Sequence, residues 1–160
     1  MTRPYKVLFL CTGNSARSIL SEYLLRSIAG TRFEVYSAGS FPTGKVNPLA
    51  VDVLSDVYNI DASDAQSKSM DTLSETKFDF VITVCDNARE SCPVWSNQTI
   101  VAHWSSPDPA AVEGSPAEKY RAFKDVASEI NGRVQLFASL PFETLDRSRL
   151  IAATAEIGSK

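Results

Sequence analysis

The stretch that decides the fold is residues 8–20, LFLCTGNSARSIL, where an apolar run ends at Cys11 and a helical pattern begins near Arg17. This order is typical of a buried parallel strand that passes through a short loop into a helix. Such a loop directs backbone N–H groups inward and adds the positive end of the helix dipole. The stretch therefore predicts an anion-binding loop that begins with a thiol.

Strand and helix patterns alternate along the rest of the chain. The predicted strands are short, rich in β-branched or aromatic residues and apolar on both faces, and they cover 6–10, 33–38, 78–84 and 99–104. Helical patterns end at Gly30, restart at Asn47-Pro48 and at the capping box SPAE (115–118), and return in the tail near 145–157. Asn131-Gly132 favours a bend or an interruption of the third helix.

This alternation predicts an α/β fold. We expect a four-stranded parallel sheet of order 2-1-3-4 with helices on both faces, followed by a C-terminal helical tail. Ligands bind beyond the carboxyl ends of the strands in such sheets. Cys11, Cys85 and Asp108 follow the first, third and fourth strands, so all three are predicted at the same edge.

Composition narrows the class of protein. The chain has 160 residues, a formal charge of −3 and a pI near 5.2, which argues against nucleic acid or an acidic membrane as a partner. It lacks an apolar run of the ~20 residues that a membrane-spanning helix needs. The short apolar run at the start precedes no cleavage site of a secretion signal, so we expect a cytoplasmic protein.

The three cysteines are Cys11, Cys85 and Cys92, an odd number that argues against a disulfide framework. They include no CxxC pair, so zinc is disfavoured and no metal site is expected. The single histidine, His103, is expected to be a packed, hydrogen-bonded residue at a strand end. The thiols are then either buried and inert or chemically active.

The loop chemistry favours activity at Cys11. Arg17 offers a planar fork for two oxygens of an anion, and its charge, with the helix dipole, is expected to lower the pKa of the Cys11 thiol. The alternative is a buried cysteine with an incidental surface arginine. The predicted oxyanion-binding residues are contiguous: Thr12, Gly13, Asn14, Ser15, Ala16, Arg17 and Ser18.

Residues 11–18 resemble the C-x5-R-S loop of low-molecular-weight protein tyrosine phosphatases and of the arsenate reductases that share their fold. VYSAG (35–39), VNP (46–48) and Asp108-Pro109 extend the resemblance over most of residues 6–112. It implies a phosphatase-like domain over 1–140, with 141–160 as a helical extension that belongs to the same domain or forms an interface. The loop alone does not separate the two activities, because arsenate and phosphate have nearly the same shape and charge.

The segment VCDNARESCP (84–93) favours the reductase. The resemblance implies that thioredoxin-coupled arsenate reductases carry a cysteine pair here, matching Cys85 and Cys92. Reduction of As(V) to As(III) takes two electrons, which a thiol–disulfide relay from Cys11 through Cys85 to Cys92 supplies without a cofactor. This relay needs a mobile segment from about 85 to 95. The alternative is that both cysteines only pack in the core.

Asp108 matches the family's general acid, which protonates the departing oxygen and needs burial or a bound anion to raise its pKa. A turn aspartate before proline is the simpler alternative. Related tyrosine phosphatases tend to carry aromatic residues after this Asp-Pro, but here Ala110 and Ala111 follow. A site without an aromatic wall suits a small inorganic oxyanion, so arsenate is the expected substrate, with phosphate or sulfate competing.

Some relatives bind potassium behind the loop through four side chains. Asn14, Glu22 and Ser37 match three of them, but the fourth position holds Lys68, which could pair with Glu22 instead. We therefore expect no potassium site. The functional alternatives that remain are a phosphatase acting on phosphate monoesters and a non-catalytic anion or redox sensor. The cysteine spacing favours thioredoxin over glutaredoxin and glutathione as the reductant.

Overall fold

The computed structural model describes residues 3–85 and 98–160. Its strands are β1 (Tyr5–Cys11), β2 (Phe33–Gly39), β3 (Phe80–Thr83) and β4 (Ile100–His103). They pair in parallel in the order β2-β1-β3-β4, as predicted. The register sets Cys11 opposite Gly39 and Thr83 opposite His103, so the loops that follow the strands meet at one edge.

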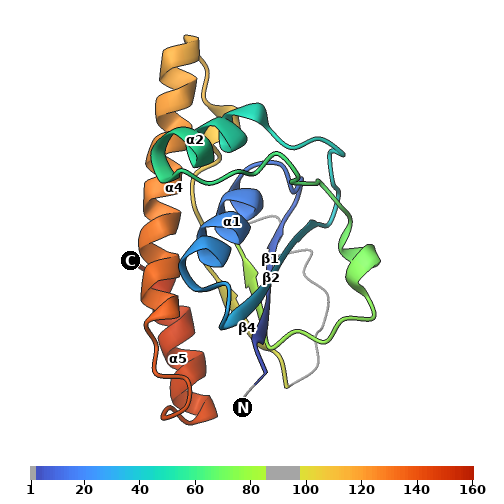
Figure 1. Ribbon diagram of the computed structural model, residues 1–160, viewed down its shortest axis with the longest axis vertical. Coiled ribbons are helices and arrows are strands. Elements are labelled where there is room, and N and C mark those ends of the chain that lie inside the picture. The colour runs from blue at the N-terminus through green and yellow to red at the C-terminus, as the bar shows by residue number, and fades with distance from the viewer. Residues whose placement is uncertain (1–2, 86–97) are drawn as a thin grey trace.

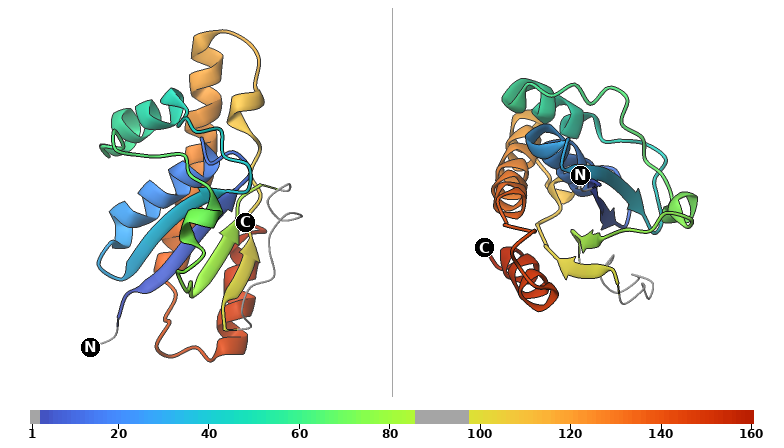
Figure 2. Two further views of the ribbon diagram at one scale, coloured as in Figure 1. Left: turned by 90° about the vertical axis from the view of Figure 1, so that its right-hand side faces the viewer. Right: turned by 60° about the horizontal axis from the view of Figure 1, so that its bottom comes forward.

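Helices cover the sheet. In the described ranges these are α1 (Arg17–Ala29), α2 (Pro48–Tyr58), α4 (Pro116–Ala138) and α5 (Arg147–Ile157), with the short 3₁₀ turns η1 (Met70–Leu73) and η2 (Pro109–Ala111). Helices α1, α4 and α5 lie on one side of the sheet and η1 lies on the other (Figures 1 and 2). Residues 7–11 of β1 are buried on both faces, which explains the continuous apolar run in the sequence.

The core is richest in aromatic rings between the sheet and α4. Phe137 of α4 lies 5.0–5.6 Å from the rings of Phe33, Phe80, Phe142 and Trp104. Phe137 has no exposed surface. These contacts fix α4 on the sheet, and α4 in turn packs along α1, which begins at the end of the Cys11–Arg17 loop.

Local signals set most helix ends. Asn47 accepts a hydrogen bond from the Leu49 N–H at the start of α2, and Ser115 and Glu118 form the predicted capping box of α4. The predicted interruption at Asn131-Gly132 is wrong, because α4 runs without a break to Ala138. A glycine in a helix costs only about 1 kcal/mol, and the burial of Ile130 and Val134 on either side outweighs it.

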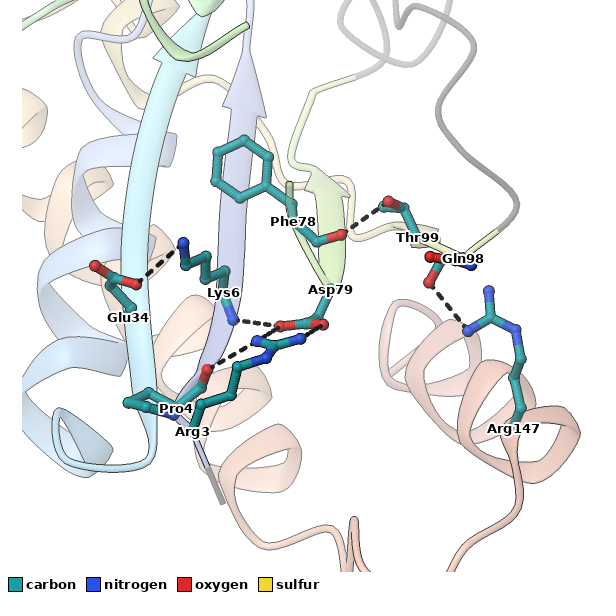
Figure 3. A network of polar contacts seen from close by, with 9 residues as sticks. All are labelled: Arg3, Pro4, Lys6, Glu34, Phe78, Asp79, Gln98, Thr99 and Arg147. Carbon is teal, nitrogen blue, oxygen red and sulfur yellow. Dashed lines mark hydrogen bonds and ion pairs between the residues drawn. The ribbon is translucent and has the colours of Figure 1, made fainter. Parts of the chain in front are cut away.

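A polar network closes the opposite, amino end of the sheet (Figure 3). Both Arg3 terminal nitrogens bind the Asp79 carboxylate at 2.8 Å, and the Lys6 N–H donates to the same carboxylate at 2.8 Å. Burial opposes ionisation of Asp79, but these bonds together hold its pKa below the usual range. The start of β1 is therefore fixed to the start of β3, far from the loop at Cys11.

Candidate active site

The loop from Cys11 to Arg17 is held by its carbonyl groups. The carbonyl oxygens of residues 11, 12, 13 and 15 accept hydrogen bonds from the N–H groups of residues 40, 41, 43 and 47, at 2.8–3.1 Å. Ser67 Oγ adds a further bond to the Gly13 carbonyl at 3.0 Å. Because the carbonyls face the 40–47 segment, the loop N–H groups face the other way. The N–H of Arg17 opens α1, so the positive helix end adds to this field.

Two positions permit the tight loop path. Asn14 has a φ of 49°, a left-handed conformation that asparagine tolerates better than most residues. Gly39, at the end of β2, lies so close to the loop that an added Cβ would be 2.5 Å from the Thr12 carbonyl oxygen. Gly13 serves close approach rather than a positive φ, since a Cβ there would lie 3.2 Å from Thr43 Cγ2.

Cys11 and Cys85 come together at this loop, as their places after β1 and β3 predict. Both are buried free thiols, and their side chains are hydrogen-bonded to each other. The Thr12 N–H also donates to Cys85 Sγ at 3.3 Å, and Thr12 Oγ1 lies 3.4 Å from that sulfur. The second thiol therefore lies where the first N–H group of the loop points.

The expected low pKa of Cys11 is wrong for this arrangement. The hydrogen bond to Cys85 and burial both raise the pKa of the Cys11 thiol, while the Arg17 charge and the Thr12 N–H lower it by less. Two adjacent buried thiols resist carrying two negative charges, so the pair holds on to a shared proton. The sequence predicted that Cys85 lies at the same edge of the sheet, but not that its side chain would raise the pKa of Cys11 by more than Arg17 and the Thr12 N–H lower it.

Arg17 and Asp108 meet on the other side of the loop. Arg17 Nη1 donates to the Ser106 carbonyl at 2.9 Å, and Arg17 Nη2 lies 3.8 Å from Asp108 Oδ2. Asp108 also caps η2 by accepting the Ala110 N–H at 3.0 Å, and its side chain is 45% exposed. The aspartate is thus the turn residue of the simpler alternative, yet it lies at the site with its carboxylate next to the guanidinium.

A buried network lies behind the loop. Asn14 Nδ2 donates to Ser18 Oγ at 2.8 Å and to Ser37 Oγ at 3.0 Å. Ser37 Oγ in turn donates to Glu22 Oε1 at 2.6 Å. The side chains matched to a potassium site therefore bind one another.

The cation in contact with Glu22 is Arg26, whereas the Glu22 charge reaches Lys68 without an ion pair between them and raises the pKa of Lys68 by less than burial lowers it. The Arg26 guanidinium contacts the Glu22 carboxylate and also donates to the Val35 carbonyl at 2.8 Å. Lys68 Nζ instead donates to the Gln66 carbonyl at 3.2 Å, and burial lowers the pKa of Lys68. Across the described ranges, no group of three His, Cys, Asp or Glu side chains could hold a metal ion.

Other predicted residues have simpler outcomes. His103 is packed and hydrogen-bonded, with Nδ1 2.6 Å from Thr83 Oγ1, as expected. Cys92 and most of the segment 85–95 lie outside the described residues. None of the helices in the described part of the chain is long and apolar enough to cross a membrane.

Comparisons with known proteins identify the class. The family model of low molecular weight phosphotyrosine protein phosphatases matches residues 6–149, and the chain belongs to this family. It is 37% identical over 132 residues to an arsenate reductase of Oceanobacillus iheyensis and 37% identical over 132 residues to one of Bacillus subtilis. Each of these matches covers 82% of this chain and 94% of the relative.

Solved structures agree with this assignment. An arsenate reductase in the phosphate-binding state has a TM-score of 0.70 at 27% identity, covering 82% of this chain and 94% of its own. A thioredoxin-dependent arsenate reductase of Corynebacterium glutamicum has a TM-score of 0.66 at 28% identity, and the match covers 89% of this chain and 65% of the C. glutamicum chain. A low molecular weight protein tyrosine phosphatase from T. tengcongensis has a TM-score of 0.70 at 25% identity, and the match covers 85% of this chain and 99% of the phosphatase chain.

Sequence reasoning assigned no individual role to three residues that lie at the loop or contact the segments beside it. Gly39, Ser106 and Arg133 lie 22 or more positions from the nearest end of the 11–17 loop, and only the fold brings them near it. Gly39 had two signals: it directly follows the predicted strand 33–38, and it ends the VYSAG motif (35–39) that extends the resemblance. Ser106 acts through its backbone carbonyl, which no side-chain pattern reports.

Proposed function

We propose that this protein is an arsenate reductase that works by a three-cysteine relay. The observation that carries the proposal is the contact between two buried free thiols, Cys11 and Cys85, at a loop whose N–H groups face away from the anchored carbonyls. The relatives of about 37% identity that are named arsenate reductases support it. Reduced thiols also suit the cytoplasm.

The first step takes place at the anion-binding loop. The N–H groups of residues 12–18 and the Arg17 guanidinium hold the arsenate oxygens, and Arg17 favours the Cys11 thiolate over the thiol. The Cys11 thiol gives up its proton to the Asp108 carboxylate, and the thiolate attacks arsenic to form an S–As bond. Asp108 then passes this proton to the departing oxygen, which leaves as water. Arsenic remains As(V) in this adduct.

The second step transfers the electrons. Cys85 attacks the Cys11 sulfur, the S–As bond breaks with its electron pair passing to arsenic, and arsenite leaves as As(III). A Cys11–Cys85 disulfide remains, so two thiols are oxidised for each arsenate reduced. The contact between the Cys11 and Cys85 side chains supports this step, because Cys85 would not have to move far to attack.

The third step regenerates the nucleophile. Cys92 attacks the Cys85 sulfur, which releases the Cys11 thiolate and leaves a Cys85–Cys92 disulfide for an external dithiol. This step rests on the sequence, because Cys92 lies outside the described residues. Thioredoxin is the proposed reductant, supported by the cysteine spacing and by the name of the C. glutamicum relative; glutaredoxin with glutathione is the alternative.

Arsenite production coupled to a thioredoxin system tests the proposal. Wild type should turn over, whereas Cys85→Ser and Cys92→Ser should each lose multiple turnover and keep weak hydrolysis of a phosphate monoester. Full arsenate turnover by both variants would refute the relay. Efficient ester hydrolysis by wild type without arsenate turnover would identify a phosphatase, and negligible turnover of both substrates would favour the sensor.

A further inference from the structure

Arg133 is a buried arginine that the proposed relay does not use. It lies in the middle of α4, its side chain is 7% exposed, and it pairs with Glu129 Oε1 at 2.9 Å. Burial of a guanidinium is costly unless several acceptors surround it. Besides Glu129 on the same helix, the acceptors around Arg133 belong to two distant parts of the chain, so this residue bridges them.

One side of the Arg133 guanidinium binds residues 105–106, the segment whose carbonyl accepts a hydrogen bond from Arg17. Arg133 Nη1 donates to the Ser105 carbonyl at 2.8 Å and to Ser106 Oγ at 3.1 Å. The Ser106 carbonyl accepts Arg17 Nη1 at 2.9 Å. The two guanidinium groups therefore bind the same short segment, so movement of Ser106 would move the acceptor that fixes Arg17.

The other side of the guanidinium holds the end of the chain. Arg133 Nη2 lies 3.4 Å from the Gly158 carbonyl oxygen and 3.3 Å from the Lys160 carbonyl oxygen. Figure 1 shows α5 returning beside α4 after the turn at the bottom of the molecule. Most of α5, from residue 150 on, lies beyond the family match, which ends at residue 149.

The same tail also touches the strand that leads to this segment. Trp104 Nε1 donates to the buried Thr154 carbonyl at 2.9 Å. Gly158 packs so tightly that an added Cβ would overlap the His103 carbonyl oxygen. Residues 103–106 thus contact α5 and Arg133 on one side, and on the other side the Ser106 carbonyl binds Arg17.

We infer that Arg133 is a positioning residue for the oxyanion site: with the 141–160 extension, it sets the place of Ser106 and thereby of Arg17. The inference rests on the proposed function, because Arg17 matters here as the ligand of the oxyanion. It gives the extension a role as part of the catalytic unit. A purely structural role would instead change the stability of the fold and leave anion affinity unchanged.

A double-mutant cycle separates these roles, with inorganic phosphate as the probe and calorimetric titration as the readout. Arg133→Met should weaken phosphate binding roughly tenfold in the wild-type background. In an Arg17→Lys background the same change should weaken it by less than about twofold, because the residue through which it acts is already lost. Arg121→Met, an exposed arginine of the same helix, should leave the affinity unchanged.

Ser106→Ala is the milder second variant if Arg133→Met folds poorly. It removes one of the Arg133 acceptors but keeps the backbone carbonyl, so phosphate binding should weaken by about two- to threefold. Equal affinity for wild type, Arg133→Met and Ser106→Ala would overturn the inference and leave the proposed function standing. Failure of wild type to bind phosphate or arsenate would overturn both.

Discussion

Replacing Gly39 with alanine tests how the 40–47 segment and β2 hold the loop. The new Cβ would lie 2.5 Å from the Thr12 carbonyl oxygen, 3.1 Å from Asn14 Cβ and 3.2 Å from the Asn14 nitrogen. The closest atom and one of the other two are backbone, so rotation of a side chain cannot relieve the contact. A separation of even 3.0 Å requires the loop to move by about 0.5 Å from its 2.5 Å starting point.

Both stability and anion binding should respond. Overpacking of a tight site costs about 1–3 kcal/mol of folding free energy. A misplacement of 1 Å at a reacting centre costs about 10²-fold in rate, so a shift of about half that size should reduce kcat/KM for arsenate roughly tenfold. Urea unfolding measures the first effect, and arsenite production measures the second.

Gly132→Ala is the matched control, because it makes the same chemical change where no atom lies within 4 Å of the new Cβ. It sits inside α4 and should stabilise the protein by about 0.5–1 kcal/mol without changing arsenate turnover. If Gly39→Ala keeps wild-type stability and turnover, the loop is not held as described and the reasoning fails.

Three further predictions follow from other parts of the structure. Because the pKa of Asp79 is lower in the folded than in the unfolded chain, its ionised carboxylate stabilises the fold at pH values above the unfolded pKa of about 3.9. This stabilisation is lost as the pH falls through the folded pKa. In Asp79→Asn, the free energy of unfolding measured with urea should therefore depend less on pH between about 5 and 2. Phe137→Ala should lower the free energy of unfolding by about 3–5 kcal/mol, and a loss below 1 kcal/mol would mean that the ring cluster is not the core. Exchange of potassium for sodium should change neither thermal stability nor phosphate affinity, because Glu22 already binds Arg26 and Ser37; a potassium-specific rise in either would contradict the network.

Much of the fold follows from short-range patterns. The buried strands are apolar on both faces, and Asn47 and Ser115 mark helix starts by their own hydrogen bonds. The wrong break at Asn131-Gly132 came from local propensity, which the buried neighbours of Gly132 override. Short patterns succeed where the cause is itself local.

The sequence predicted which residues meet at the site, but not how their contacts change the pKa of Cys11. Cys11, Cys85, Arg17 and Asp108 could be assigned to one edge, because parallel strands end together. The pKa of Cys11 depends on the contact with Cys85 and on burial, which only the folded chain supplies, and this is why the predicted direction of the shift was wrong. The Arg26 partner of Glu22 is the exception, since a spacing of i to i+4 in a helix could have indicated it.

A single turnover of the Cys92→Ser variant on arsenate tests the relay most directly. The variant should release one arsenite per protein molecule and then stop, with Cys11 and Cys85 joined in a disulfide that peptide mapping by mass spectrometry detects. Arsenite release with both thiols still free, or adduct formation at Cys11 without a Cys11–Cys85 disulfide, would contradict the account.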